Sequence, residues 1–425
     1  MMDVIIIGAG AAGLAAARII SKTGKTVTVL EARNRAGGRI YTLREGGFSF
    51  PVEAGAEFIH GNLPHTTALL KEAEVSFYET TGNTWNVNKS EVSEGDLFPD
   101  EWEELLTKLR ELEHDMSIAE FLNLYFQDAK YSALRNSIIR FVQGYDAADA
   151  NKASAFALRD EWSGEDSLTG YRPQGGYSLL IDFLVNESLQ QGCVFHFNNV
   201  VREIYRHKDH AEVKAENGEI FQSKKVLITI PPAVIKAGGI LFTPALADHM
   251  DAIQKIETGS VIKFLVEFKS AFWEQKKNST PYRSMPGLQF VFSDAYIPTW
   301  WTQQPVPDPI LTGWLAGPDA ADSTKDNDAI LVEAIKALAY IFGCTQQDIE
   351  QQVKAMKVIN WGADPFSLGA YAYKTVDTNS ALAILSQPIH NTIYFAGEAY
   401  YNGSEMGTVE AALASGITSA RKILA

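Results

Sequence analysis

Cysteine is nearly absent from this chain of 425 residues, which has Cys193 and Cys344 and no others. Two cysteines exclude a disulfide framework and a cysteine-rich metal site, and they suit a reducing compartment. We therefore expect a cytoplasmic protein without a metal centre. The predicted fold already begins at residue 3, so we also expect no signal peptide.

Long apolar runs and basic residues are scarce as well. No uncharged apolar run reaches the roughly 18 residues that a membrane span needs. Lysine and arginine total 37 against 52 acidic residues, which gives a formal net charge of −15. This charge argues against nucleic acid and anionic membrane surfaces as partners. It is compatible with a cationic substrate, although an acidic surface also serves solubility alone.

The strongest pattern lies in the first forty residues. A strand, a glycine-rich turn, a helix and a second strand are predicted at residues 4–7, 8–13, 14–21 and 26–30. In the G-x-G-x-x-G turn, Gly8 permits the tight bend, Gly10 lets the backbone approach a pyrophosphate, and Gly13 lets the helix pack closely on the strand. Glu31 ends the second strand and is placed to accept hydrogen bonds from ribose hydroxyls. The sequence therefore predicts a dinucleotide-binding unit.

The residues after Glu31 indicate which dinucleotide is bound. The string Ala32-Arg33-Asn34-Arg35-Ala36-Gly37-Gly38-Arg39 resembles the second fingerprint of flavoproteins of the glutathione-reductase-like class. The resemblance implies that Gly37 and Gly38 pass close to the cofactor, and that Arg33 and Arg39 contact it. The cofactor is then expected to be FAD.

The rest of the chain alternates between two kinds of segment. Residues 66–165 are mainly helical, with one amphipathic helix at 103–116, and residues 261–268, 288–292 and 310–315 predict a more antiparallel sheet. The predicted class is α/β, with a Rossmann-type FAD-binding domain interleaved with an α+β substrate domain that has a mixed, largely antiparallel sheet. The FAD-binding domain is expected at 1–70, 172–250 and 390–425, and the substrate-binding domain at 71–171 and 251–389.

Motifs spread along nearly the whole chain resemble the flavin-containing amine oxidases, which include monoamine, polyamine and spermine oxidases and the flavin histone demethylases. They are Gly8–Gly13, Gly37-Gly38-Arg39, Gly55-Ala56 with His60-Gly61, Gly175-Gly176, Gly259-Ser260-Val261-Ile262-Lys263, Trp361, Gly369-Ala370-Tyr371 and Phe395-Ala396-Gly397-Glu398. The resemblance implies further cofactor contacts at Gly55, Ala56, Val200, Trp361, Gly397, Glu398, Gly407 and Thr408. A helix beginning near Gly407 would point its positive end at the flavin, which favours a reduced, anionic ring.

Three side chains are the candidate catalytic residues. Lys263 lies among apolar residues on a strand, and the resemblance implies that it holds a water against flavin N5; the alternative is a lysine that extends from an edge strand to solvent. Tyr371 matches one of two aromatic walls that sandwich the amine. His60, in a turn similar to that of animal polyamine oxidases, would bind the amine or accept its proton near neutral pH; a purely structural histidine is the alternative.

The second aromatic wall and the covalent flavin link of monoamine oxidases are both missing. The second wall would fall near Ser404, in Gly403-Ser404-Glu405-Met406-Gly407. Tyr400 or Tyr401 would supply an aromatic ring from a different position, and core packing is the alternative for both. Ser404 and Tyr401 are the candidate substrate contacts. Ala370 occupies the position of the flavin-linking cysteine, so FAD is expected to bind noncovalently.

The resemblance implies oxidation of a neutral amine by hydride transfer to flavin N5, giving an imine and then an aldehyde, while O2 becomes H2O2. The expected partners are a small amine and O2, with no nucleic acid or membrane, in a monomer or homodimer. Amines with a second polar or cationic group are favoured over simple aryl amines. Two alternatives remain, a related flavoprotein that acts on a non-amine substrate and a flavin-binding scaffold with a degraded site.

Overall fold

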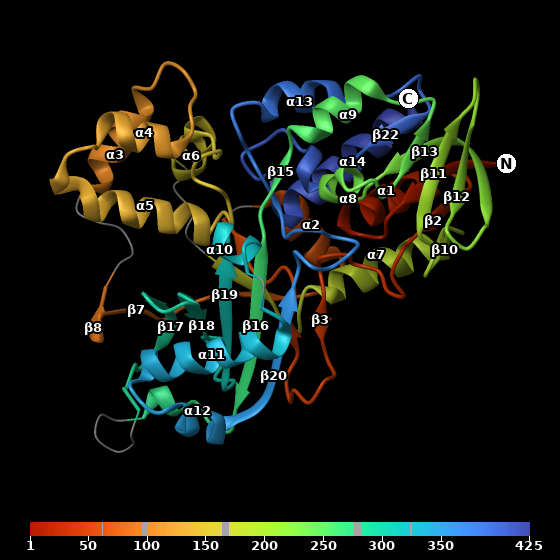
Figure 1. Ribbon diagram of the computed structural model, residues 1–425. Helices are drawn as coiled ribbons and strands as arrows, with labels where there is room; N and C mark the ends of the chain where they lie inside the picture. The colour runs from red at the N-terminus through yellow and green to blue at the C-terminus, as the bar shows by residue number, and fades with distance from the viewer. Residues whose placement is uncertain (62, 96–100, 164–169, 276–281, 324) are drawn as a thin grey trace.

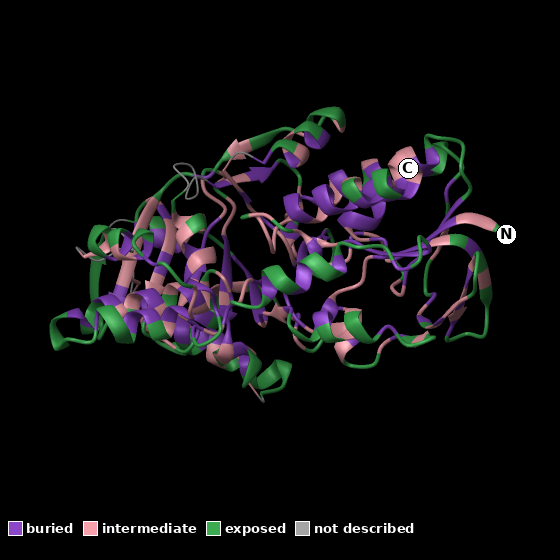
Figure 2. Ribbon diagram, turned by 90° about the horizontal axis from the view of Figure 1, so that it is seen from above, coloured by how far each residue is buried: buried purple, intermediate pink, exposed green. Residues whose placement is uncertain are grey.

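Two large β-sheets with helices packed on both organise the chain (Figure 1). The computed structural model describes residues 1–61, 63–95, 101–163, 170–275, 282–323 and 325–425. Buried residues concentrate in the strands and on the inner faces of the helices, and the outer helix faces are exposed (Figure 2). None of the helices in these described ranges is long and apolar enough to cross a membrane.

The first sheet contains the N-terminal strand and is mainly parallel. Its strands are β1 (Met2–Ile7), β2 (Val27–Leu30), β10 (Val194–His196), β11 (Val201–Arg206), β12 (Ala211–Ala215), β13 (Ile220–Ile228), β14 (Leu241–Thr243) and β22 (Ile393–Phe395). Their order is β10-β2-β1-β13-β12-β11-β14, with β22 beside β13. β10, β2, β1, β13 and β22 run parallel, and β12 pairs antiparallel with β11 and β13. Because helices cover both faces of β1, its continuous Val-Ile-Ile-Ile run is buried.

Each face of this sheet has its own helices. One face packs against α1 (Ala11–Ser21), α2 (Pro64–Glu72), α7 (Ser178–Gln190) and α14 (Val409–Leu424). The other face packs against α8 (Pro232–Lys236), α9 (Ala247–Gln254) and α13 (Thr378–Leu385). The alternation of β1 follows this division, since Val4 and Ile6 join the first cluster while Ile5 and Ile7 join the second.

The second sheet is antiparallel except where β17 and β7 run parallel. Its order is β20 (Val353–Asn360), β16 (Val261–Phe268), β19 (Ile310–Ala316), β18 (Thr299–Trp301), β17 (Leu288–Ser293), β7 (Asn83–Asn88) and β8 (Glu91–Glu94). The apolar face packs against α11 (Asn327–Phe342), with α12 (Gln346–Gln352) beside it. β16 lies between β19 and β20 and is buried throughout, so the edge-strand alternative for Lys263 is wrong.

Short strands and a helix connect the two sheets. They are β3 (Thr42–Leu43), β4 (Val52–Glu53), β5 (Ile59–His60), β6 (Phe77–Glu79), β9 (Gly170–Pro173), β15 (Glu257–Thr258), β21 (Ala372–Tyr373) and α10 (Pro318–Ala321). β9 pairs with both β5 and β6, and this pairing places Arg172 in the same small sheet as His60.

A separate helical cluster is formed by α3 (Trp102–Arg110), α4 (Ile118–Tyr125), α5 (Ser132–Gly144) and α6 (Ala155–Trp162). The prediction of one helix over 103–116 is wrong, because α3 ends at Arg110. Asp115 instead accepts hydrogen bonds from Ser154 Oγ at 2.7 Å and from the Phe156 N–H at 3.1 Å. Ser117 forms a capping box that starts α4. These side chains compete with the helix for backbone groups.

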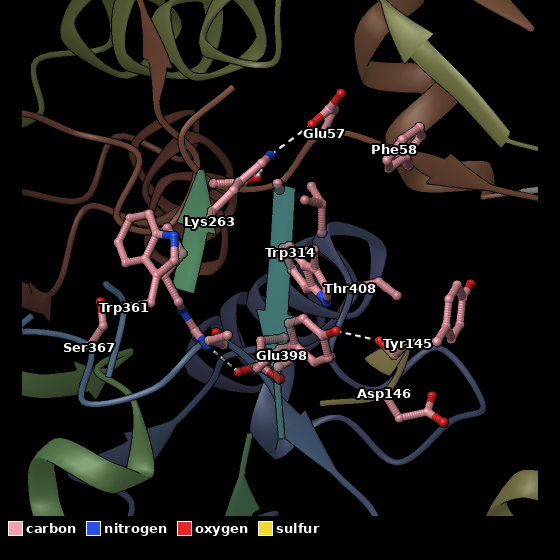
Figure 3. Close-up of a pocket in the computed structure, with 18 of the residues that line it drawn as sticks. Glu57, Phe58, Tyr145, Asp146, Lys263, Trp314, Trp361, Ser367, Glu398 and Thr408 are labelled. Carbon is pink, nitrogen blue, oxygen red and sulfur yellow. Dashed lines mark hydrogen bonds and ion pairs between the residues drawn. The ribbon is translucent and has the colours of Figure 1, made fainter. Parts of the chain in front are cut away.

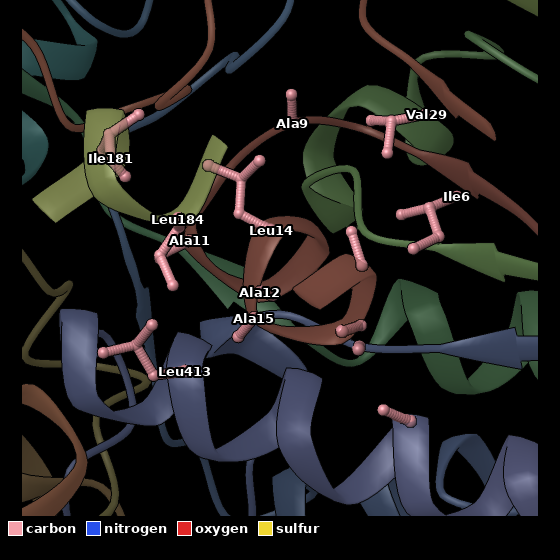
Figure 4. Close-up of a cluster of buried hydrophobic side chains, with 14 of the residues drawn as sticks. Ile6, Ala9, Ala11, Ala12, Leu14, Ala15, Val29, Ile181, Leu184 and Leu413 are labelled. Carbon is pink, nitrogen blue, oxygen red and sulfur yellow. The ribbon is translucent and has the colours of Figure 1, made fainter. Parts of the chain in front are cut away.

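Close contact between α1 and α14 holds the glycine-rich turn in place (Figure 4). A Cβ atom at Gly416 would lie 2.2 Å from the carbonyl oxygen of Ala12, so no side chain fits there. Similarly, a Cβ atom at Gly13 would lie 2.1 Å from the carbonyl oxygen of Gly8. The small residues of α1 thus let the helix approach both the turn and α14.

We predict that Gly416→Ala lowers the free energy of unfolding by about 1–3 kcal/mol, because the methyl group forces α14 away from α1. Gly144→Ala is the matched control, since a Cβ atom at Gly144 would have no neighbouring atom within 4 Å and alanine favours helix. Thermal unfolding of both variants checks this. A Gly416→Ala protein as stable as the Gly144→Ala protein would contradict the close packing.

Candidate active site

A cavity of about 2310 Å³ reaches from the glycine-rich turn to the antiparallel sheet. Gly8, Gly10 and Glu31 line one part of it, and Lys263 and Tyr371 line another. Figure 3 shows the second part, where side chains from several chain segments point toward one another. The cavity therefore brings the expected cofactor and catalytic residues together.

The turn offers an open backbone surface to this cavity. Gly8 has a φ of +106°, which favours glycine, and its N–H donates to the Leu30 carbonyl at 2.8 Å. A Cβ atom at Gly10 would have no neighbouring atom within 4 Å, so the backbone is uncovered on that side. The Gly37 N–H donates to the Ala9 carbonyl at 2.8 Å, which brings the second glycine pair against the first turn.

Glu31 ends β2 beside the turn. Its carboxylate accepts hydrogen bonds from the N–H groups of Ala9 at 2.7 Å and Arg33 at 2.9 Å. The side-chain oxygen of Asn199, which also lines the cavity, is buried without a hydrogen-bond partner in the described part of the chain. Glu31 thus fixes the backbone of the glycine-rich turn (the glycine cradle), and the buried Asn199 oxygen is an acceptor at the cavity that the described residues leave unused.

Of the other expected cofactor residues, Gly13 does not line the cavity, whereas the rest do. Those that line it are Arg33, Gly37, Gly38, Arg39, Gly55, Ala56, Val200, Trp361, Gly397, Glu398, Gly407 and Thr408. Arg39 pairs with Glu398 at 2.8 Å and also donates to the Ala370 carbonyl, and Arg33 pairs with Asp364. Thr408 caps the N-terminus of α14. An open glycine backbone, an unpaired buried acceptor and this length of cavity fit a dinucleotide, and Ala370 offers it no nucleophile.

Lys263 has a charged partner that the sequence did not reveal. Its Nζ lies 2.7 Å from Glu57 Oε2 and 3.0 Å from the Gly55 carbonyl oxygen, and its side chain is 1% exposed. Glu57 also accepts hydrogen bonds from Arg172 Nε at 3.0 Å and Trp301 Nε1 at 2.9 Å. Burial alone would raise the pKa of Glu57, but Lys263 and Arg172 hold it below its ordinary value. The sequence signal that could have revealed this partner was the acidic residue Glu57 within the Gly55–Gly61 motif.

Aromatic residues surround the part of the cavity near Lys263. Tyr371 donates its hydroxyl to the Tyr145 carbonyl, and its ring lies nearly parallel to that of Trp314, with centroids 6.5 Å apart. Trp314 pairs with Lys263 across β19 and β16. Phe58 packs on Trp301 with centroids 5.6 Å apart. Trp314 is therefore an aromatic neighbour of Tyr371. Spacing along the sequence does not predict this contact, because the pairing of β19 with β16 places Trp314 beside Lys263.

Of the residues near the expected second aromatic wall, only some line the cavity. Ser404 lines the cavity, whereas Tyr401 does not, and a Cβ atom at Gly403 would lie 2.2 Å from the Tyr401 ring. Tyr400 is 8% exposed and packs against Phe395 in the core. The core-packing alternative therefore holds for Tyr400.

His60 lines the cavity between Phe58 and Tyr145, with ring centroids 5.6 and 5.5 Å away. Burial lowers its pKa to about 4. Withdrawal from water favours the uncharged ring, which makes His60 a weak proton acceptor near neutral pH; that it binds the amine or accepts its proton stays a prediction. A neutral imidazole still offers one donor and one acceptor.

Two carboxyl groups mark another wall. Asp146 and Glu161 line the cavity, and Asp146 Oδ2 is buried without a hydrogen-bond partner in the described residues. Burial raises the pKa of Glu161 to about 7. Burial and the neighbouring Glu161 charge raise the pKa of Asp146 well above its usual range. A smaller second cavity also touches both acids. No spacing in the sequence indicates these two residues, which we call the acid pair.

A metal centre has no ligand set in the described residues, where no group of three or more His, Cys, Asp or Glu side chains could hold an ion.

Comparison with known proteins identifies the family. The family model described as flavin containing amine oxidoreductase matches residues 11–424. Polyamine oxidase 4 of Oryza sativa subsp. japonica is 28% identical, over 98% of this chain and 88% of that protein. Human lysine-specific histone demethylase 2 is also 28% identical, but this chain spans only 53% of its length.

Solved structures show the same fold. Putrescine oxidase, wild type bound to putrescine, has a TM-score of 0.81 at 20% identity, over 100% of this chain and 99% of that one. Cyclohexylamine oxidase from Brevibacterium oxydans IH-35A has a TM-score of 0.79 at 19% identity, over 99% and 98% of the two chains. Together with the family match, the cavity and its cradle lead to one conclusion: the chain belongs to the flavin-containing amine oxidoreductase family.

Proposed function

We propose that this protein oxidises an amine with noncovalently bound FAD as cofactor and O2 as electron acceptor. FAD, when bound, would supply the redox chemistry: it would take a hydride from the carbon beside the amine nitrogen and would pass two electrons, with two protons, to O2 to give H2O2. The resulting imine hydrolyses to an aldehyde. The observation that carries the proposal is one cavity that joins the glycine cradle to Lys263 and Tyr371.

The mainly parallel sheet is the proposed FAD-binding domain, of the Rossmann type found in glutathione-reductase-like flavoproteins. All of its strands fall within 1–70, 172–250 and 390–425. Strands β7, β8 and β16–β20 of the other sheet fall within 71–171 and 251–389, the proposed substrate-binding domain. The parallel β10-β2-β1-β13 order with the glycine turn after β1 supports this assignment. Both cysteines are free, which supports a cytoplasmic location.

The side chains around the cavity have separate proposed tasks. Tyr371 and Trp314 hold the amine against apolar ring surfaces and exclude water. His60 is neutral, so it can accept a hydrogen bond from the amine or donate one to it without adding a second positive charge beside it. Lys263 lines the same cavity, and its buried ammonium is held by Glu57 and the Gly55 carbonyl. A substrate amine must arrive neutral, because its nitrogen lone pair assists the departure of the hydride.

We further propose that the substrate has a second cationic group, which the acid pair binds. Two carboxyl groups that share a cavity wall without a cation in the described residues are suited to an ammonium ion. Burial raises both pKa values, and the nearness of the Glu161 charge raises that of Asp146 further, so the charged forms are disfavoured while the site holds no cation. A distal ammonium stabilises the ionised pair, so binding strengthens as the pH rises through about 7 and weakens as it falls.

We predict that heat or acid releases intact FAD from the purified yellow protein. The side chain at the position of the usual covalent link, Ala370, has no group able to bond the flavin. Precipitation of the denatured chain followed by absorbance and mass measurement of the supernatant checks this. Flavin that stays with the precipitated chain would contradict noncovalent binding.

We predict that Asp146→Asn and Glu161→Gln each lower the ratio of kcat/KM for putrescine to kcat/KM for butylamine by about 10- to 100-fold, the effect of losing a hydrogen bond to a charged group. The two amines differ in the distal nitrogen, so the ratio isolates its binding. In the parent enzyme this ratio should rise between about pH 6 and about pH 8, and in the variants it should be flatter.

Asp160→Asn is the matched control for the acid pair. Asp160 lies on the same helix as Glu161 and lines the cavity, but its side chain is 61% exposed and pairs with Arg159 at 3.0 Å. The control should keep the parent ratio. Equal loss of both activities in the Asp146 and Glu161 variants would show that the acid pair does not select the distal nitrogen.

A further inference from the structure

Glu57 lies at the centre of a buried ion cluster that includes Lys263, Arg172 and Trp301. The side chains of Glu57, Lys263 and Arg172 are 3%, 1% and 4% exposed. Oε2 of Glu57 pairs with Lys263, while Oε1 accepts from both Arg172 and Trp301. Since Arg172 also donates to the carbonyls of Thr302 and Gln304, the carboxylate is fixed from several sides.

This arrangement uses two of the three N–H donors of the Lys263 ammonium. One goes to Glu57 Oε2 at 2.7 Å and one to the Gly55 carbonyl oxygen at 3.0 Å. An ammonium group has three donors, so one N–H remains, and Lys263 lines the cavity. Two fixed acceptors therefore set the direction of the remaining donor.

The charges in the cluster are unequal. Glu57 contributes one negative charge, against the two positive charges of Lys263 and Arg172. Loss of the carboxylate would leave the two positive groups near each other, buried from water and without their shared counter-charge. Glu53 and Tyr78 are the other titratable groups that interact with Glu57. Burial, and to a smaller extent the charge of Glu57, raise the pKa of Glu53 to about 7, and no hydrogen bond joins Glu53 to Lys263 among the described contacts.

We infer that Glu57 is a positioning residue for amine oxidation: it keeps Lys263 protonated and directs its remaining N–H into the cavity. Lys263 then acts as a charged hydrogen-bond donor and cannot be the base that takes the proton of the substrate amine. The inference rests on the proposed function, since it assigns a role within the same cavity.

The test is the pH dependence of Glu57→Gln. Anaerobic flavin reduction by butylamine and the reaction of the reduced enzyme with O2 are each followed by stopped-flow absorbance. Without the carboxylate, burial and the charge of Arg172 disfavour the ammonium form of Lys263, so a new ionisation should enter at least one rate profile. That rate should fall by about 10-fold or more on the alkaline side. Profiles identical to those of the parent would overturn the inference.

Glu267→Gln is the matched control for the loss of a buried carboxylate. Glu267 lies on the same strand as Lys263, is 1% exposed, and pairs with Lys354 at 2.9 Å. It does not line the cavity. This variant should lose stability without gaining a new ionisation, and a Glu267→Gln profile that matches that of Glu57→Gln would show a general structural effect.

A double-mutant cycle separates positioning from simple structural support. If Glu57 acts through Lys263, Glu57→Gln should change neither rate further in a Lys263→Met background. The midpoint potential of bound FAD gives a readout apart from turnover. It should fall relative to the parent as pH rises in Glu57→Gln, since a neutral Lys263 no longer stabilises added negative charge. The same pH effect should be missing from Glu57→Gln/Lys263→Met, and additive effects in the cycle would contradict positioning.

Glu57→Asp covers the case in which Glu57→Gln fails to fold with FAD. Aspartate keeps the charge but is shorter by one methylene group. The rates should fall about 10-fold without a new ionisation, because the donor is misdirected while Lys263 stays charged. Parent rates in this variant would overturn the positioning role. Failure of every amine to reduce the parent enzyme would instead contradict the proposed function.

Discussion

The ion cluster around Glu57 is the constraint on which the site depends. Glu57 meets Arg172, Lys263 and Trp301, which lie 115, 206 and 244 residues further along the chain. Charges removed from water cost several kcal/mol each unless they are paired. Separating these segments would leave buried charges without partners, which is strongly unfavourable. The cluster therefore fixes the antiparallel sheet against the loop that follows β4. The same pairing that holds the fold together also sets the charge of the cavity.

The cavity is electrostatically divided as a result. Lys263 brings positive charge to one wall, while Asp146 and Glu161 bring carboxyl groups to another. A neutral reacting nitrogen suits the first environment, and a charged distal nitrogen suits the second. His60 lies between Phe58 and Tyr145 and stays uncharged. A substrate with two nitrogens could therefore be oriented by charge alone, with the aromatic rings supplying contact area.

The features predicted correctly from sequence are those determined locally or by strand alternation. The turn at Gly8–Gly13 and the buried face of Lys263 follow from short-range spacing and period. Glu57 and Trp314 come to the cavity through contacts between segments that lie far apart in the chain, and residue spacing within one segment does not predict such contacts. The helix over 103–116 was mispredicted because apolar periodicity continues past Arg110, while Asp115 beyond it accepts hydrogen bonds from the Ser154 hydroxyl and the Phe156 N–H.

The central claim is that this cavity oxidises an amine at a bound flavin. Anaerobic mixing of the purified holoenzyme with spermine, putrescine, benzylamine or tyramine, followed at the visible flavin absorbance, tests it most directly. We predict that a di- or polyamine bleaches the flavin, and that admitting O2 restores the absorbance with H2O2 released. An oxidised spectrum that persists with every amine would contradict amine oxidation, and bleaching by benzylamine in preference to the polyamines would contradict the role given to the acid pair.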